Sequence, residues 1–467
     1  MKSNQKSKIG LPCKWDTVFV IICAVAAFFL WNHPDISETA QHTKILLDDI
    51  FQGRFLSFYQ DTMDAKAVLG YANAAHYHIV FYLLCGIWNL PLYLLGLVIP
   101  VGEFVFLLWT KALGTVAWVL CGFLLKKIAE NQGTQNPYLG WTPYFLWMCP
   151  IAFLTVLGMG QYDSLCLVFL LTGIWMYQQK KILPFVLVMG AAMVFKMFAV
   201  FVLIPLLLLR EKRILHLLGY GAMSLWLYLP GALLFAGRNG DAGFFNSLIA
   251  ERLFVQQLPF VAAPSVFFVL LAIIYFLCWI WQPANEQSLQ QKAIYLCFVV
   301  FALLFLCVQW HPQWLILLTP FMLLTTWQSR QPQKWMLLNG IFFAGYFVLV
   351  AYMFAGQIES NLFDFGIFGQ VSQLNAVTQT LERTNTIYFN LIPYLAELAP
   401  VAFAVPLVLG IVGKFPFKGV QLFDMLNHNQ EQTSSIRLWV YGLFFVGFGL
   451  FWFAPTLFAW CKTIGIL

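Results

Sequence analysis

The chain has 467 residues, of which 61% are hydrophobic and only 10% are charged. A soluble domain carries about 25% charged residues, so this composition excludes a cytosolic enzyme, a secreted disulfide scaffold and a nucleic-acid-binding protein. The net charge of +6 comes from Lys and Arg in short clusters between apolar runs, which is typical of loops near lipid headgroups. We therefore predict an all-α polytopic membrane protein that resides in a lipid bilayer and has no nucleic acid partner.

The first apolar run, from about residue 15 to residue 31, follows four lysines and lacks a small-residue cleavage site. We interpret it as an uncleaved first span with a cytoplasmic N-terminus. Residues 32–76 then form a long acidic loop on the extracytoplasmic side. In this loop, Asp35 and Glu38 have the spacing of an N-cap and its capping partner for a helix of about 36–52, although a carboxylate fixed at a helix start is also well placed to act as a base.

Basic clusters along the rest of the chain set the orientation of the later spans, because Lys and Arg concentrate in cytoplasmic loops. We place on the cytoplasmic side the clusters at residues 126–127, 180–181, 210–213, 292, 330–334 and 414–418. The apolar runs then predict about 13 transmembrane helices in one domain that occupies residues 1–467, with the C-terminus outside. This parity leaves residues 77–98 as a segment that does not cross and that Pro91 and Pro100 break.

Three stretches between cytoplasmic clusters have the lengths of hairpins: residues 138–179, 182–209 and 293–327. Two limbs of about 14 residues within 182–209 reach only about 21 Å each, which places the apex, near Lys196, below the outer surface. The third hairpin has His311 at its apex. Recessed apices need polar partners or water, so they predict a cavity that opens to the outside.

Three ionisable residues in these apices have a functional and a structural interpretation. Asp163 follows Gly-Met-Gly-Gln-Tyr, where it suits a turn or an N-cap as well as an active-site carboxylate. Lys196 lies in an apolar run, where it either binds an anionic group or forms a buried salt bridge with Asp163. His311 lies between Trp310 and Pro312 and fits an interfacial aromatic belt as well as a functional site.

Short motifs in these segments carry a resemblance to a known family. They are Gly160-Gln161-Tyr162-Asp163-Ser164-Leu165, Ala192-Met193-Val194-Phe195-Lys196 with the following Leu203-Ile204-Pro205-Leu206-Leu207-Leu208, and His311-Pro312-Gln313-Trp314. With an acidic loop directly after the first span, the chain resembles the GT-C class of polyprenyl-phosphate-sugar-dependent glycosyltransferases. The motifs are similar to those of bacterial relatives of GPI mannosyltransferases.

The resemblance implies a hexosyltransferase of the cell envelope. It would move a hexose such as mannose from a polyprenyl-phosphate donor to an extracytoplasmic glycan or lipid acceptor, with inversion at the anomeric carbon. The acceptor hydroxyl needs a carboxylate base and the departing phosphate needs a fixed cation. We assign Asp35 as the base, Asp163 as a second catalytic-site carboxylate that positions the sugar or Lys196, and Lys196 as the phosphate-binding cation.

Other candidate substrate-binding residues are His311, Gln161, Tyr162 and Arg54, the last of which also fits a solvated helix face. No cofactor follows from the sequence, and a divalent cation held between acidic groups stays open. Two other classes stay open as well. One is a transporter or flippase of lipid-linked sugars, for which inverted repeats would be expected, and the other is an extracytoplasmic polysaccharide polymerase or ligase.

Overall fold

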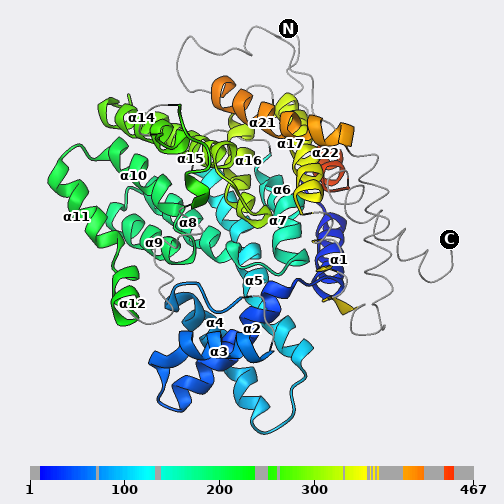
Figure 1. Cartoon of the computed structure of the whole chain (residues 1–467). Coiled ribbons are helices and arrows are strands. Elements are labelled where there is room, and N and C mark those ends of the chain that lie inside the picture. Colours follow the sequence, from blue (N-terminus) through cyan, green and yellow to red (C-terminus); the bar gives the residue numbers. More distant parts are fainter. Residues whose placement is uncertain are drawn as a thin grey trace.

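The computed structural model describes residues 11–69, 73–131, 138–236, 251–259, 263–329, 332–354, 358, 361–362, 365–367, 393–414 and 436–445. Within these ranges the regular elements are helices, and β-type pairing is limited to one isolated bridge between Gln257 and Ser265. Figure 1 shows the helices gathered in one body with a smaller lobe at one end. The predicted all-α class is confirmed for this part of the chain.

Four helices in the described ranges are long and apolar enough to cross a membrane, or seven if each of three bent pairs counts as one span. They are α4 (Ile79–Gly96), α5 (Glu103–Glu130), α15 (Glu286–Cys307) and α17 (Pro332–Met353). These helices indicate a membrane-embedded protein, but they do not reproduce 13 crossings. Most other apolar helices have 10–17 residues, which is short for about 30 Å of hydrocarbon.

Helix α4 corrects one expectation. Pro91 lies inside this 18-residue helix and does not end it, so the prediction that Pro91 breaks the segment 77–98 is wrong. The helix is long and apolar enough for a span, and only 33% of its apolar window is buried. The corresponding window of α15 is 78% buried, so α15 is a central helix and α4 a peripheral one.

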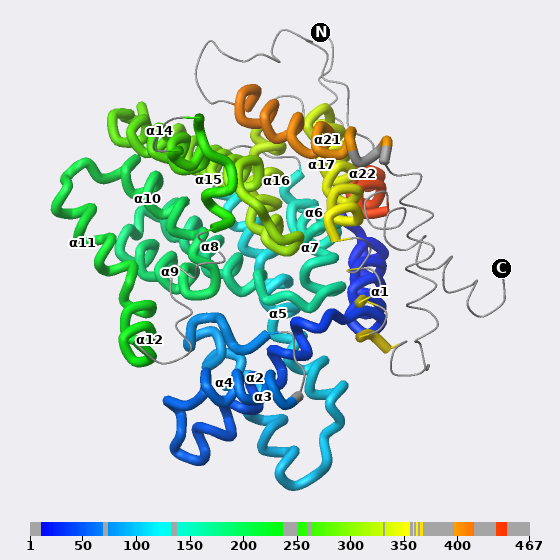
Figure 2. Tube along the Cα trace, in the orientation of Figure 1, coloured from blue at the N-terminus to red at the C-terminus, as the bar shows by residue number. Residues whose placement is uncertain are grey.

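The predicted acidic loop is largely helical. The chain turns by 71° between α1 (Lys14–Leu30) and α2 (Pro34–Phe51), and η1 (Phe55–Ser57) and α3 (Phe58–Leu69) follow. Helix α2 packs on α4 and α5. Figure 2 shows α2, α3 and α4 together in the lobe at the lower end of the view, from which α5 runs into the body.

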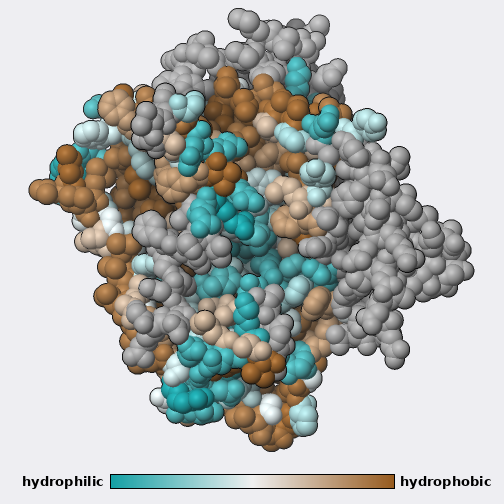
Figure 3. Space-filling model, viewed as in Figure 1, coloured by the Kyte–Doolittle hydropathy of each residue, from teal (hydrophilic) through white to brown (hydrophobic). Residues whose placement is uncertain are grey.

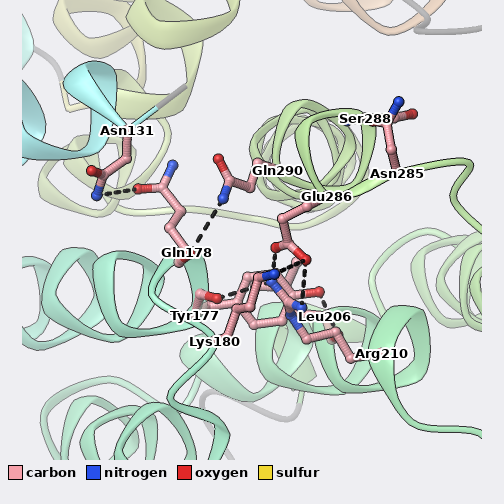
Figure 4. A network of polar contacts seen from close by, with 10 residues as sticks. All are labelled: Asn131, Tyr177, Gln178, Lys180, Leu206, Arg210, Asn285, Glu286, Ser288 and Gln290. Atoms are coloured by element: carbon pink, nitrogen blue, oxygen red, sulfur yellow. Dashed lines mark hydrogen bonds and ion pairs between the residues drawn. The ribbon is translucent and has the colours of Figure 1, made fainter. Parts of the chain in front are cut away.

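Helices α9 (Ile182–Phe195) and α10 (Ala199–Arg210) form the predicted hairpin at 182–209, and α8 (Asp163–Gln178) precedes it. Figure 4 shows the polar network that joins its two ends. Glu286, at the start of α15, pairs with the Arg210 guanidinium and lies 3.6 Å from Lys180 Nζ. Because both ends of the segment meet one carboxylate, α9 and α10 run out and back, and the break near Lys196 lies at the far end of the pair.

The remaining helices of the described ranges are η2 (Leu139–Trp141), α6 (Thr142–Trp147), α7 (Pro150–Phe153), η3 (Leu154–Gly158), α11 (Ile214–Ser224), α12 (Tyr228–Leu234), α14 (Val266–Ile280), η4 (Pro312–Leu317), α16 (Thr319–Gln328), α21 (Pro393–Gly413) and α22 (Ile436–Phe444). The chain bends by 54° between α11 and α12. The three lysines before residue 11 and the predicted external C-terminus lie outside the described residues.

Candidate functional site

The three predicted apices and the start of α2 line one cavity of about 530 Å³. Its walls come from α2, the segment before α4, the turn before α8, the break between α9 and α10, and the break before η4. Figure 3 shows hydrophilic side chains gathered in a hollow in the middle of this face, with hydrophobic surface above it and to its left. The sequence-based expectation that recessed apices surround a polar cavity therefore matches the geometry.

Asp35 lies on the α2 wall, in the first turn of that helix. The helix begins at Pro34, and the side chain of His33 accepts the Asp35 N–H as the N-cap. Proline is favoured at the first helical position because its fixed φ suits a helix start. The predicted capping pair of Asp35 and Glu38 is therefore wrong, because both residues lie inside the helix, one turn apart and facing the cavity.

The carboxylate of Asp35 is held by side chains from two segments. Gln161 Nε2 donates a hydrogen bond of 2.6 Å to Oδ2, and His33 Nδ1 lies 3.4 Å from Oδ1. Burial acts to raise the pKa of Asp35, but these two contacts and the imidazole of His311 outweigh it and lower the pKa to about 2. Asp35 is thus ionised at neutral pH and presents an acceptor oxygen to the cavity.

The turn before α8 brings Gln161 to Asp35. Gly160 adopts φ +67°, a left-handed conformation that glycine reaches without steric strain. A Cβ at this position would lie 3.1 Å from Ile36 Cγ2, so the turn also needs glycine for its close approach to α2. The preceding residues 154–158 form a π-helical turn, whose Thr155 carbonyl accepts the Gln161 N–H at 2.9 Å. The backbone at Gln161 is therefore fixed by the packing of Gly160 on α2 and by the hydrogen bond to Thr155.

Lys196 occupies the break between α9 and α10 and lines the cavity. Its Nζ lies 3.3 Å from Asp163 Oδ1. Three aromatic rings surround the ammonium, with centroids at 5.2 Å for Tyr77, 5.8 Å for Tyr162 and 5.8 Å for Trp314. Aromatic faces stabilise a cation, so Lys196 is held as a fixed positive charge that retains a side open to the cavity.

Asp163 lies behind Lys196. It is fully buried, does not line the cavity and is the first residue of α8, whose N-cap is Tyr162. Neither of its carboxylate oxygens has a hydrogen-bond partner among the described residues, so Lys196 is its electrostatic partner. In this arrangement Asp163 acts on the cavity through Lys196. The geometry fits both a positioning role and a structural salt bridge.

Five of the chain's seven histidines line the cavity: His33, His42, His76, His78 and His311. Burial, with His76 nearby, lowers the pKa of His42 to about 4. Burial lowers the pKa values of His76 and His78 as well. These three imidazoles are neutral at pH 7 and present hydrogen-bonding groups without charge.

Sequence reasoning missed two charged residues of the cavity. Glu38 faces it from α2 and accepts a hydrogen bond from Asn73 Nδ2 at 3.1 Å. Arg252 lies with its guanidinium 5.8 Å from the ring centroid of Trp314, so it shares that ring with Lys196. The helical spacing of Asp35 and Glu38 could have signalled a shared face. No local pattern marks Arg252, because its partners are distant in sequence.

Arg54 and a divalent cation, which the sequence leaves open, are the other candidate components of the site. Arg54 does not line the cavity; its guanidinium is 3.0 Å from Asp49 Oδ1 and 3.7 Å from Asp61 Oδ2, beyond the far end of α2. The substrate-binding role predicted for Arg54 therefore has no support in its position. Among the described residues no group of three or more His, Cys, Asp or Glu side chains is arranged to hold a metal ion.

Comparisons with known proteins add no identification. A scan of the chain against protein-family models, a search of curated proteins and a search of solved structures each found no match. The resemblance to GT-C glycosyltransferases thus rests on the short motifs of the sequence alone.

Proposed function

We propose that the protein is a membrane glycosyltransferase that moves a hexose from a polyprenyl-phosphate donor to a glycan or lipid acceptor, with the cavity on the extracytoplasmic side and the N-terminus in the cytoplasm. The observation that carries the proposal is the pairing of a fixed cation with an ionised carboxylate in one cavity. Asp35 lines it from α2, where it accepts a hydrogen bond from Gln161, and Lys196 lines it from the break between α9 and α10, next to the ring of Trp314.

The reaction assigns each of these groups a role. The acceptor oxygen attacks the anomeric carbon, the bond from that carbon to the phosphate oxygen breaks, and its electron pair leaves with the polyprenyl phosphate. Lys196, aided by Arg252, stabilises the negative charge that develops on the phosphate. Asp35 accepts the proton of the acceptor hydroxyl. Because its pKa of about 2 makes it a weak base, the proton moves late, when the new bond has already made the hydroxyl acidic.

The neutral imidazoles suit a sugar better than a small ion. They can donate to or accept from hydroxyl groups without adding charge, and His42 and His76 lie on the same side of the cavity as Asp35, on α2 and the segment before α4. Glu38 gives this wall a second carboxylate one helical turn from Asp35. If Asp35 serves only to orient the acceptor, Glu38 is the next candidate for the base.

Donor turnover by the purified protein tests the proposal. The full chain, reconstituted in nanodiscs, is given polyprenyl-phosphate-linked mannose, glucose or galactose with extracted envelope lipids as acceptor, and release of polyprenyl phosphate is measured. Asp35→Asn should fold, bind donor and lose kcat by about 10²–10⁴-fold. Asp61→Asn is the matched control, since this acidic residue lies in the same lobe but pairs with Arg54 and does not line the cavity.

Two results would overturn the assignment. Near wild-type turnover by Asp35→Asn at saturating acceptor would exclude Asp35 as the base, and Glu38→Gln would be examined in its place. If the wild-type protein left every donor intact but moved it between leaflets, the transporter alternative would replace the transferase. Mass spectrometry of lipid-linked sugars from cells that lack the protein should show the unused donor accumulating.

A further inference from the structure

A buried lysine of α5 holds the end of α1, directly before the elbow that presents Asp35. Lys111 is only 1% exposed, and its Nζ donates hydrogen bonds to the carbonyl oxygens of Phe28 at 2.8 Å and Trp31 at 2.5 Å. The last carbonyls of a helix lack partners within the helix, and lysine is one of the side chains that satisfy them. Lys111 therefore fixes the point at which α1 ends.

Only a short elbow separates this anchor from Asp35. Trp31 precedes Asp35 by four residues, and between them the backbone turns by 71°. Asn32, in the elbow, is fully buried, and its backbone N–H donates to the carbonyl of Leu362 at 3.1 Å. Because this stretch is too short to absorb a shift, a movement of the end of α1 would move the first turn of α2 with it.

The same turn of α5 also contacts the partner of Asp35. The carbonyl of Gly114 accepts a hydrogen bond of 2.8 Å from Ser164 Oγ, and a Cβ on Gly114 would lie 3.3 Å from the carbonyl oxygen of Gln161. Residues three apart lie on the same side of a helix. One turn of α5 thus touches both segments that form the hydrogen bond between Asp35 and Gln161, which are 126 residues apart in the sequence.

We infer that Lys111 is a positioning residue, which anchors the elbow to α5 so that the Asp35 carboxylate meets Gln161 and faces the cavity. Lys111 does not line the cavity, so it acts through Asp35. A buried polar group costs free energy unless it is hydrogen-bonded, and the two carbonyl oxygens accept hydrogen bonds from the Lys111 side chain. The catalytic consequence rests on the proposed function, whereas the anchoring of the elbow does not.

The test uses the full chain in nanodiscs and two independent measurements. Hydrogen exchange of peptides covering residues 28–36 reports on the elbow, and kcat with donor KM reports on catalysis. Lys111→Met should raise exchange at the elbow and lower kcat by about 10- to 100-fold, the effect expected of a displacement near 1 Å, with donor KM unchanged because Lys196 is untouched. Lys111→Arg should restore most of both. Thr115→Val, which removes only an intrahelical hydrogen bond to the Lys111 carbonyl, should match wild type.

Each outcome decides one part of the inference. Unchanged exchange in Lys111→Met would overturn the anchoring. Raised exchange with wild-type kcat, or with a loss confined to donor KM, would overturn the positioning role. If wild-type protein transfers no sugar, the proposed function fails, and the exchange measurement alone then decides the anchoring. If Lys111→Met does not fold, Lys111→Gln, which is shorter and uncharged, takes its place with the same expectations.

Discussion

The ion pair between Lys196 and Asp163 permits a test that separates a structural from a functional role. Asp163 is fully buried, the Lys196 side chain is 9% exposed, and their charged atoms are 3.3 Å apart. Removing one partner of such a pair leaves an uncompensated buried charge and costs about 3–5 kcal/mol. Replacing both partners by uncharged groups is often close to neutral. The double variant Lys196→Met/Asp163→Asn should therefore be more stable than Lys196→Met alone.

Activity should respond in the opposite way. A charge-assisted hydrogen bond to the departing phosphate is worth about 1.5–3 kcal/mol, which corresponds to a loss of about 10- to 150-fold in kcat/KM. The double variant loses this contact although its fold is restored. We thus expect a protein with a near wild-type unfolding midpoint that stays impaired in release of polyprenyl phosphate. Asp163→Asn alone, which keeps the cation, should chiefly raise donor KM.

A matched control comes from the other end of the same helices. Arg210 and Glu286 form an ion pair in the network of Figure 4, away from the cavity. Arg210→Met/Glu286→Gln should leave donor KM and kcat unchanged, because neither residue lines the cavity. Full activity in a well-folded Lys196→Met/Asp163→Asn protein would show that the pair only holds the fold, and the phosphate-binding role of Lys196 would then be wrong.

Three further predictions follow from the geometry around the cavity. The pKa of His42 is lowered to about 4 in the folded chain, so the unfolded chain binds more protons between about pH 4 and pH 6.5. The thermal unfolding midpoint in nanodiscs should therefore fall as the pH drops through that window. In His42→Gln the midpoint should fall less steeply. An equal midpoint of the wild-type protein at pH 7 and pH 5 would contradict the prediction. Gly160→Ala should destabilise the protein by about 1–3 kcal/mol, because Gly160 has a left-handed backbone and lies close to Ile36. Gly102→Ala is the control, since a Cβ at Gly102 would meet open space. Equal unfolding midpoints for the two variants would refute the strain argument. Arg54→Gln should lower the unfolding midpoint, because the buried carboxylate of Asp49 loses its cationic partner. Donor KM should stay unchanged. A raised donor KM would support a substrate-binding role for Arg54.

The breaks between helices are the part of the fold that the sequence predicts well. Residues 182–209 are too many for one straight span between two basic clusters and too few for two complete spans. In the structure this stretch forms helices of 14 and 12 residues, and the break between them lies at Lys196. Polar residues in apolar runs likewise mark the turn at Gly160 and the break at His311. These signals are local, because each depends on segment length and on the cost of burying polar groups.

The pairings across the cavity are not predictable in this way. The hydrogen bond between Asp35 and Gln161 joins residues 126 positions apart, and no periodicity encodes it. The capping pattern at Asp35 and Glu38 predicted a helix that begins at about residue 36. The helix begins earlier, at Pro34, because proline is favoured at the first helical position. Arg54 has the same charge as Lys196, but a nearby buried carboxylate holds it outside the cavity. Charge alone thus identifies candidates, and tertiary contacts select among them.

The location of the cavity follows from a constraint on backbone in a membrane-embedded protein. A broken helix leaves N–H and C=O groups that lipid cannot satisfy, so such breaks occur where protein or a water-filled cavity surrounds them. Here three breaks contribute Tyr162, Lys196 and His311 to the same cavity, while Lys111 satisfies the carbonyls at a fourth, the elbow before Asp35. Because the breaks lie together, one polar region can satisfy the backbone N–H and C=O groups of all of them. It also gathers cations, carboxylates and neutral imidazoles in one cavity, and these are the groups that the proposed transfer from a lipid-linked sugar would use.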